Sequence, residues 1–366
     1  MASEDRLSRY REKRDFDASP EPAGSARGDT DGERPRFVIQ EHHATRLHWD
    51  LRLEHDGVLW SWAVPRGLPW SPDENNLAVH TEDHPLEYLE FSGEIPAGSY
   101  GAGTMTIWDR GTYDLEKLEP EKVVVALHGE RVSGRYALFS TDGDQWMVHR
   151  MDPPSDPDRR PPPMDWTPMQ ATPVDALDAL PEERDRYGYE IWWTGRRCLV
   201  TSSGGRVDVT VDGTPVTDLL PEVRRLGPAL GSTEAIFDAV LVGVGEGGVP
   251  QHDPAGVDAR LGARPDRAKR LERRHPVAAL LVDLLWLDGH PLVALRYVDR
   301  RARLLDLDLA SDAWQTPRHR LGDPDSFLEA VAAQGGRGIV AKGLDGTYEP
   351  GRTAADWFAI PSRAPG

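Results

Sequence analysis

The chain has 366 residues, of which 39% are hydrophobic and 12 are Trp, and this is enough for two domains with sizeable cores. The formal net charge is −18, with 17 Lys+Arg against 28 Asp+Glu over residues 1–150 and 26 against 33 afterwards, which excludes a generally basic surface for nucleic acid. No apolar run reaches membrane-spanning length, and the N-terminus is charged from its fourth residue, which is not typical of a secretory signal. The single cysteine, Cys198, excludes an internal disulfide and a cysteine metal cluster. We therefore expect a soluble cytoplasmic protein.

Residues 1–35 are polar and rich in charge, Gly and Pro, without a hydrophobic period, which predicts a tail or an extended arm. The stretch from Lys13 to Pro22 is less random than its surroundings. A solvated linker is the alternative that composition alone favours.

Residues 36–151 consist of short apolar stretches separated by turn signals, a pattern typical of a compact β barrel or sandwich of about eight strands. The turn signals are Asp56-Gly57, Pro65-Arg66-Gly67, Pro96-Ala97-Gly98, Gly101-Ala102-Gly103, Arg110-Gly111 and Asp142-Gly143.

One of these stretches alternates in a way that separates a core face from a chemical face. On a β-strand, His48, Asp50 and Arg52 share one face. The other face carries Leu47, Trp49, Leu51 and Leu53. A turn would bring His42 back to the polar face, where two imidazoles and a carboxylate suit Mn²⁺ or Zn²⁺ and an Arg suits an oxyanion. The alternative is a half-exposed strand with a plain surface His and Asp pair.

A second polar run, from His80 to Pro85, follows the apolar residues 77–79. If the strand continues, His80, Glu82 and His84 share a face. His84 would then reach the same site as a cationic partner or proton donor for a phosphoryl group. The alternative is that His84 simply precedes a proline turn.

Several spaced motifs over residues 9–150 closely resemble the 3′-phosphoesterase domain at the N-terminus of the multidomain bacterial end-joining DNA ligase. The motifs are residues 42–52, Ser61-Trp62-Ala63-Val64-Pro65, residues 82–88, residues 95–103, Trp108-Asp109 and the tail segment Arg14 to Pro22. The resemblance implies a β barrel that removes a terminal ribonucleoside and then the 3′-phosphate from DNA or RNA ends during break repair by non-homologous end joining.

The resemblance also implies the roles of individual residues. It places Mn²⁺, or another divalent metal, on His42, His48 and Asp50, and the scissile phosphate on Arg52, Arg66 and His84. The remaining residues that it places in the catalytic site are Arg14, Asp15, Glu21, Glu82 and Tyr88. Two positions depart from the family: Arg66 stands where Lys is usual and preserves the charge, whereas Asn76 stands where Arg is usual and removes a phosphate contact.

The Pro-rich residues 152–163 predict a stiff linker and the clearest domain boundary. Strand-like runs at Ala235–Val244, Val277–Leu287 and Gly338–Lys342 then alternate with a helix-like run at Ser326–Ala333, which is an α+β pattern. We therefore expect a polar arm at 1–35, a β-barrel domain at 36–151, the linker, and an α+β domain at 164–363.

Residues 164–361 resemble the nucleotidyltransferase (adenylation) domain of ATP-dependent DNA ligases, without the OB-fold domain that ligases use to close on DNA. The motifs that carry this resemblance are Pro168-Met169-Gln170-Ala171, residues 282–289, residues 338–342, residues 348–352 and Trp357. The resemblance would make Glu190, Trp192 and Lys342 part of a nucleotide site.

The residues that carry ligase catalysis are changed. Trp192 stands where the family has its nucleophilic lysine, and Thr194 replaces the following Asp; no lysine occurs between residues 122 and 269. Indole is not a nucleophile and arginine stays protonated, so covalent attachment of AMP is not expected, and neither is the use of ATP. The other departures are Val240 and Arg337 for two Glu, and Ala359 and Pro361 for two Lys.

Three functional classes follow. The leading interpretation is a metal-dependent 3′-end-healing phosphoesterase fused to an inactive ligase domain. The alternatives are an active ATP-dependent DNA ligase and a non-catalytic scaffold that binds DNA ends. Expected partners are DNA or RNA 3′ ends, with a Ku-like end-binding protein, a polymerase or a separate active ligase, and nucleoid association when acting on DNA.

Overall fold

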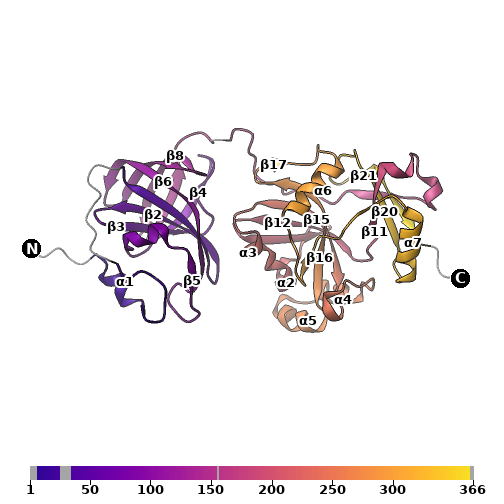
Figure 1. Cartoon of the computed structure of the whole chain (residues 1–366), viewed down its shortest axis with the longest axis horizontal. Helices are drawn as coiled ribbons and strands as arrows, with labels where there is room; N and C mark the ends of the chain where they lie inside the picture. Colours follow the sequence, from indigo (N-terminus) through magenta and orange to yellow (C-terminus); the bar gives the residue numbers. More distant parts are fainter. Residues whose placement is uncertain (1–5, 25–33, 155, 363–366) are drawn as a thin grey trace, which may run out of the picture. The chain divides into compact units, whose positions relative to one another are not determined.

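The computed structural model describes residues 6–24, 34–154 and 156–362. The chain divides into two compact units between Pro157 and Asp158, within the Pro-rich stretch (Figure 1). None of the helices in the described ranges is long and apolar enough to span a membrane.

The first unit is built on a closed barrel of eight antiparallel strands, which confirms the expected fold and selects a barrel over a sandwich (Figure 1). The strands around the barrel are β1 (Arg36–His43), β2 (Leu47–His55), β3 (Val58–Val64), β4 (Asn75–His80), β9 (Gln145–Arg150), β8 (Ser133–Asp142), β7 (Lys122–Gly129) and β6 (Gly103–Glu119). Strand β6 closes the barrel because it is long enough to pair with β1 along its first half and with β7 along its second. A short strand, β5 (Gly93–Ile95), is added beside β6.

The barrel wall formed by β1, β2 and β3 is covered on both faces. Its inner face contributes to the core, and the predicted inward residues Leu47, Trp49, Leu51 and Leu53 are all there, together with Trp62; Trp146 of β9 belongs to the same core. Its outer face packs against helix α1 (Ser8–Glu12), the 3₁₀ helix η1 (Leu86–Glu90) and β5 through a second cluster. That cluster contains Tyr10, Val38, Leu59, Tyr88, Leu89, Ile95 and Met105. The described part of the arm therefore folds onto the barrel instead of extending into solvent.

The second unit contains two sheets with helices packed on them, which confirms the α+β expectation. The five-stranded sheet has the order β10 (Gln170–Pro173), β21 (Thr353–Pro361), β20 (Gly338–Gly343), β11 (Tyr187–Ile191) and β19 (Arg320–Leu321). The other sheet has the order β14 (Thr214–Pro215), β13 (Arg206–Val211), β12 (Arg196–Ser203), β15 (Ala235–Gly243), β16 (Val277–Leu287) and β17 (His290–Pro291), with β18 (Trp314–Gln315) also paired to β16.

The helices of this unit are mostly short. The α-helices are α2 (Pro221–Arg224), α3 (Leu226–Leu230), α4 (Ala255–Leu261), α5 (Ala268–Arg274), α6 (Tyr297–Asp306) and α7 (Pro324–Ala333). The 3₁₀ helices are η2 (Leu177–Ala179), η3 (Arg184–Arg186), η4 (Thr217–Leu219), η5 (Glu246–Gly248) and η6 (Pro265–Arg267). Helix α6 packs on β16 and helix α7 on β20. The predicted runs at 235–244, 277–287, 326–333 and 338–342 thus correspond to β15, β16, α7 and β20.

Candidate functional site

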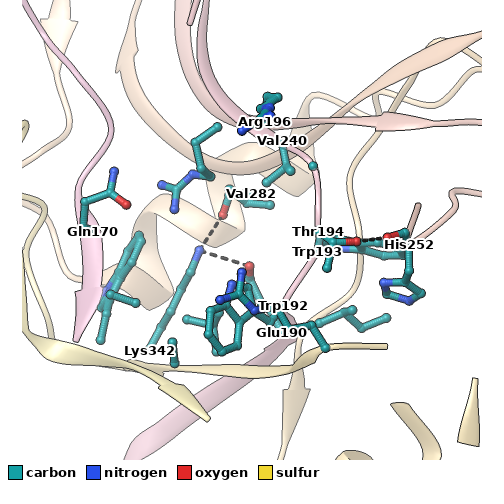
Figure 2. Close-up of a pocket in the computed structure, with 18 of the residues that line it drawn as sticks. Gln170, Glu190, Trp192, Trp193, Thr194, Arg196, Val240, His252, Val282 and Lys342 are labelled. Carbon is teal, nitrogen blue, oxygen red and sulfur yellow. Dashed lines mark hydrogen bonds and ion pairs between the residues drawn. The ribbon is translucent and has the colours of Figure 1, made fainter. Parts of the chain in front are cut away.

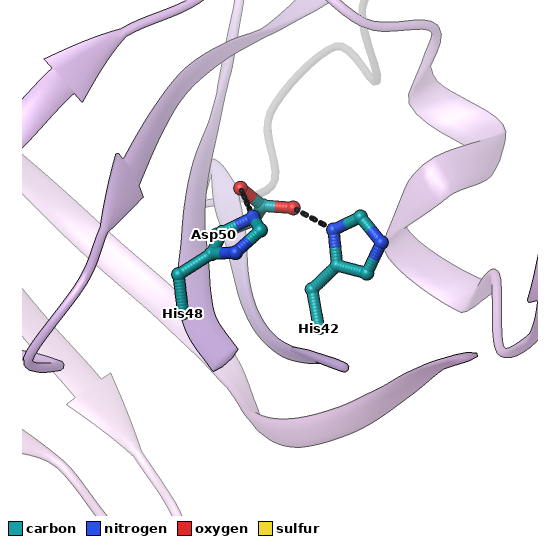
Figure 3. Close-up of side chains that lie close together, drawn as sticks. All are labelled: His42, His48 and Asp50. Atoms are coloured by element: carbon teal, nitrogen blue, oxygen red, sulfur yellow. Dashed lines mark ion pairs between the residues drawn. The ribbon is translucent and has the colours of Figure 1, made fainter. Parts of the chain in front are cut away.

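A hairpin of β1 and β2 brings the two predicted histidines together. His42 and His48 are direct register partners, with ring centroids 4.7 Å apart. Asp50 lies two residues further along β2 on the same face, and one ligand atom from each of the three side chains lies within 4.8 Å of the others (Figure 3). Residues 44–46 form the expected turn between His42 and β2, and this turn places the three side chains next to one another.

The hydrogen bonds around the two imidazoles fix which ring nitrogens face the cluster. Nε2 of His42 lies 2.9 Å from the carbonyl of Gly101, and Nδ1 of His48 lies 3.0 Å from the carbonyl of Arg46. A carbonyl can only accept, so both of these nitrogens donate. The opposite nitrogens, 3.6 Å from the two Asp50 oxygens, are then the lone-pair atoms in the neutral rings. This arrangement, with a backbone carbonyl behind each ring, is the one that metal-binding histidines use.

Arg52 lies beside the cluster, and hydrogen bonds to three other side chains fix the position of its guanidinium group. Its guanidinium donates to Asp50 (3.0 Å), to the side-chain oxygen of Gln40 (2.7 Å) and to the hydroxyl of Ser61 (2.9 Å). Two of its five N–H groups take no part in these bonds. Burial opposes ionisation of Asp50, but Arg52, with the two histidines, outweighs it and holds the pKa of that carboxyl well below its ordinary value.

The arm places Arg14 and Glu21 next to the cluster. Arg14 donates to Glu21 (2.7 Å) and to Glu82 (2.9 Å), and the hydroxyl of Tyr88 donates to Glu21. All of these groups are inaccessible or nearly so, and burial raises the pKa of the Tyr88 phenol, which keeps it a donor. Asp15 is different: its side chain is exposed and accepts from the backbone of Asp17, so the structure does not bring it into the cluster.

His84 joins the site, but in a neutral form and not in the protonated form that we expected. Arg14 can only donate, so Nε2 of His84 accepts from it (3.1 Å), while Nδ1 lies 2.8 Å from the carbonyl of Glu82 and must donate. Burial, followed by the charges of Arg52 and Arg14, lowers the pKa of His84 well below its ordinary value. The physical reason is that two guanidinium groups already surround a buried ring.

One further expectation, about His80, differs from the structure, and two other residues singled out by the resemblance, Arg66 and Asn76, lie away from the cluster. Strand β4 ends at His80, whose ring packs against Trp62 and Trp146 and does not share a face with Glu82 and His84. Arg66 is exposed in the turn after β3 and makes none of the contacts that tie Arg52 and His84 to the cluster. The side chain of Asn76 donates to the carbonyl of Gly67 (2.8 Å), so it holds that same turn in place.

Sequence reasoning missed Gln40 and Lys13. Gln40 accepts from Arg52 and donates to the carbonyls of Tyr88 (3.0 Å) and Phe91 (2.8 Å), and Lys13 donates to Glu82 (2.8 Å). The signal for Gln40 was available, because it alternates with His42 on β1 and therefore shares its face.

The second unit contains a cavity of about 650 Å³ between its two sheets, and Lys342 lies in its wall (Figure 2). The ammonium group of Lys342 lies 3.0 Å from Glu190 and 3.0 Å from the carbonyl of Val282, and 4.2 Å from the centroid of the Trp357 ring. Burial opposes ionisation of Glu190, but Lys342 and Arg301 outweigh it and lower its pKa.

Residues that replace the ligase motif line the same cavity. The guanidinium of Arg337 lies 3.8 Å from the centroid of the Trp192 ring. Trp193 stacks on His252 with ring centroids 4.8 Å apart (Figure 2). Thr194 donates to the backbone carbonyl of His252. Among the described residues that line this cavity, Lys342 is the only lysine.

Two family models match the chain. The DNA Ligase D 3′-phosphoesterase domain matches residues 40–140, and the ATP dependent DNA ligase domain matches residues 168–360. These matches confirm both resemblances that the motifs suggested.

Individual relatives give the same result. The chain is 39% identical to the "Multifunctional non-homologous end joining protein LigD" of Mycolicibacterium smegmatis, over 97% of this chain and 45% of that protein. It is 32% identical to the protein of the same name from Pseudomonas aeruginosa, over 98% of this chain and 47% of that protein. The chain therefore spans less than half the length of these relatives. A solved structure described as "mycobacterial DNA ligase D complexed with ATP and MES" is 27% identical, covers 54% of this chain and 60% of that chain, and has a TM-score of 0.44.

Proposed function

Because the chain belongs to the family of ATP-dependent DNA ligases and carries the 3′-phosphoesterase domain of DNA ligase D, we propose that its barrel is a divalent-metal-dependent 3′-phosphoesterase that heals DNA or RNA ends in break repair. The reaction would remove a 3′-terminal ribonucleoside or a 3′-phosphate and leave a 3′-hydroxyl. The observation that supports this most is the convergence of His42, His48 and Asp50 beside Arg52.

The donor set fits a borderline divalent cation. The donor set consists of two imidazole nitrogens and one carboxylate, and a backbone carbonyl holds each imidazole ring in place. Such a set suits Mn²⁺ or Zn²⁺. His42, His48 and Asp50 would hold the ion, which would act as a Lewis acid toward a phosphate oxygen. We propose Mn²⁺ or another divalent metal as the cofactor.

The remaining site residues act on the charge and position of the phosphate. We assign the two uncommitted N–H groups of Arg52, together with Arg14, to the phosphate, because fixed guanidinium groups in a buried site stabilise the charge that accumulates in the transition state. Gln40, Glu21 and Glu82 are positioning residues, since their contacts hold Arg52 and Arg14. Neutral His84 accepts a hydrogen bond at Nε2 from Arg14 and is oriented by the Glu82 carbonyl.

A primer annealed to a template tests this proposal. The primer would end in a 3′-phosphate or in a single 3′-ribonucleotide, and release of phosphate or of the terminal nucleoside would be followed with and without Mn²⁺. We expect turnover of both primers only with the metal. Binding of the duplex without turnover of either primer at any divalent metal would contradict the proposal and favour the end-binding scaffold.

For the second unit, we propose that it does not attach AMP to itself. Trp192 occupies the position of the nucleophilic lysine. Lys342, the one lysine among the described residues of the cavity wall, is paired with Glu190. We propose that this half serves as a docking or positioning scaffold for DNA ends, for a Ku-like protein, for a polymerase or for a separate ligase.

An active ATP-dependent ligase is the second candidate, and the match of residues 168–360 to the ligase family favours it. The two candidates differ in one measurement. Incubation of the full chain with labelled ATP and a divalent metal, followed by denaturing electrophoresis, would show covalent AMP for an active ligase and none for a scaffold.

A further inference from the structure

Tyr100 is an exposed aromatic side chain next to the metal-binding cluster. Half of its surface is accessible, which makes it the most exposed Phe, Trp or Tyr among the described residues. Every other Phe, Trp or Tyr among the described residues is more fully covered by the fold than Tyr100. A single exposed apolar residue is ordinary on a protein surface, but this ring lies beside the proposed phosphate site, where a bound substrate can reach it.

The loop that carries Tyr100 is tied directly to a proposed metal ligand. The next residue, Gly101, accepts the hydrogen bond from Nε2 of His42 (2.9 Å). Turns close the loop on both sides, with the amide of Ser99 donating to Pro96 (3.1 Å) and the amide of Ala102 donating to Ser99 (3.2 Å). Gly101 has a φ of 76°, which a residue with a side chain would adopt only with strain. The backbone at Tyr100 is therefore fixed relative to the site.

Two cations from the arm lie against the same ring. The ammonium group of Lys13 is 4.7 Å from the ring centroid of Tyr100, and the guanidinium carbon of Arg14 is 5.4 Å from it. Arg14 in turn contacts His84 at 3.1 Å. Both cations are held by the carboxylate of Glu82, so they lie together between Tyr100 and the phosphate site, and even with both in place half of the Tyr100 side chain stays accessible.

A nucleic-acid strand matches this arrangement. Proteins that hold single-stranded ends combine cations for the backbone with aromatic rings on which bases stack. A phosphate bound at the cluster brings its nucleoside with it, and the planar base of that nucleoside can stack on an aromatic ring. Other ligands that stack on tyrosine would leave the adjacent phosphate contacts unused.

We propose that Tyr100 is the stacking platform for the base of the 3′-terminal nucleotide, and that Lys13 holds the adjoining backbone phosphate. This rests on the function proposed above and extends it: the enzyme recognises the end through its terminal base as well as through its phosphate, with little preference among the bases because each offers a flat face. Tyr100 is a substrate-positioning residue, and Tyr100→Phe should preserve its role.

The test pairs an enzyme variant with a substrate variant. Two duplexes would carry a 3′-phosphate on the primer strand, one on a normal terminal nucleotide and the other on an abasic deoxyribose. The full chain would be compared with Tyr100→Ala, Tyr100→Phe and Leu118→Ala, the last a control that removes an exposed apolar side chain elsewhere on the barrel. Both kcat/KM with Mn²⁺ and binding by fluorescence anisotropy without added metal would be measured.

We expect Tyr100→Ala to lower kcat/KM and affinity about tenfold for the normal duplex, which is the usual size of one base stacked on an aromatic ring. The same substitution should have almost no effect on the abasic duplex, and Tyr100→Phe and Leu118→Ala should behave like the unmodified chain on both. An equal loss on the two duplexes would show that Tyr100 only supports the loop, and no loss on either would show that the base does not reach it.

The failure of the proposed function would look different. If the unmodified chain turned over neither duplex, the phosphoesterase assignment would be lost. The anisotropy measurement would still decide the role of Tyr100, because the difference between the normal and abasic duplexes does not depend on turnover.

Discussion

His42 and His48 are register partners on neighbouring strands, and each imidazole is held from behind by a backbone carbonyl. The lone pairs that remain converge on Asp50, so a pair of strands and two carbonyls together define the donor set. His43 provides an internal contrast. As the next residue on β1 it points to the opposite face, where its ring contacts Glu41 (2.7 Å).

This contrast gives the first prediction. His42→Ala should weaken Mn²⁺ binding by more than the roughly 10- to 100-fold that loss of an outer hydrogen-bond partner costs, and should abolish turnover, because one of three donors is removed. His43→Ala, a matched change one residue away, should leave both properties nearly unchanged. Titration calorimetry with Mn²⁺ and the 3′-phosphate assay would measure the two effects. Equal behaviour of the two variants would contradict the proposed ligand set.

The second prediction concerns the protonation of His84. Its ordinary pKa of 6.5 is lowered by burial and by Arg52 and Arg14, so its ring signal in NMR should not titrate between pH 6 and 8 in the folded chain. Because the unfolded chain takes up a proton near pH 6.5 that the folded chain does not, this group should make the barrel less stable as the pH falls through that range.

Arg14→Gln separates the causes of that shift. The substitution removes a cation and leaves the carboxylates of Glu21 and Glu82 near the ring, so both effects should raise the pKa of His84 toward its ordinary value. Arg11→Gln, a change to an exposed arginine of the same arm, is the control. A His84 that titrates near pH 6.5 already in the unmodified chain would contradict the neutral assignment.

Much of the barrel and its site was predictable from the sequence, because the information is local. The period of two from Leu47 to Leu53 fixes which residues face inward, and the hairpin that follows from it brings His42 to His48. The residues that sequence reasoning misplaced depend on long-range packing. His80 was predicted to share a face with Glu82, but the strand ends at His80, and the imidazole ring of His80 packs against Trp62 and Trp146. The neutral form of His84 depends on burial and on the charges of Arg52 and Arg14, and Arg14 lies 70 residues away in the sequence.

The third prediction concerns Lys342. Lys342→Ala should leave the proposed phosphoesterase activity of the barrel unchanged and should destabilise the second unit by about 3 kcal/mol, because it leaves the buried carboxylate of Glu190 without its closest cation. The loss of stability should lie at the lower end of the roughly 3–5 kcal/mol that breaking a buried ion pair costs, since Arg301 still lies 3.6 Å from Glu190. Lys269→Ala removes an exposed lysine of the same unit as the control. Calorimetric unfolding would measure stability, and loss of 3′-end activity would contradict the separation of roles.

The fourth prediction uses the division of the chain at residues 157 and 158. A chain that ends at residue 157 should fold and should keep the kcat of the full chain. Its KM should rise for duplex ends, because the proposed positioning surface is lost, but not for a short single-stranded substrate. The two KM values, measured side by side, would decide the matter. An unchanged KM on the duplex would contradict a positioning role, and failure to fold would instead indicate that the second unit stabilises the barrel.

The last prediction concerns Asp283, which interrupts the longest apolar run of the sequence. Its two oxygens accept from Arg300 on α6, each at 2.9 Å, and both side chains are completely buried. Arg300→Met should therefore cost about 3–5 kcal/mol, because it strands an ionised carboxylate in the core of the second unit. The double variant Asp283→Val, Arg300→Met should recover part of this loss. Recovery should be incomplete, since Arg300 also donates to the carbonyls of Leu295 (2.6 Å) and Gly346 (3.1 Å).

Arg303→Met, on an exposed position of the same helix, is the control and should change stability by no more than about 0.5 kcal/mol. Differential scanning calorimetry of the full chain should show the effect in the transition of the second unit alone. If the free-energy changes of the two substitutions simply added in the double variant, Asp283 and Arg300 would not be coupled. The burial of Asp283 would then need another explanation. A coupled pair explains why a charged residue persists in β16: it fixes α6 to the sheet next to the wall that carries Val282 and, through it, Lys342.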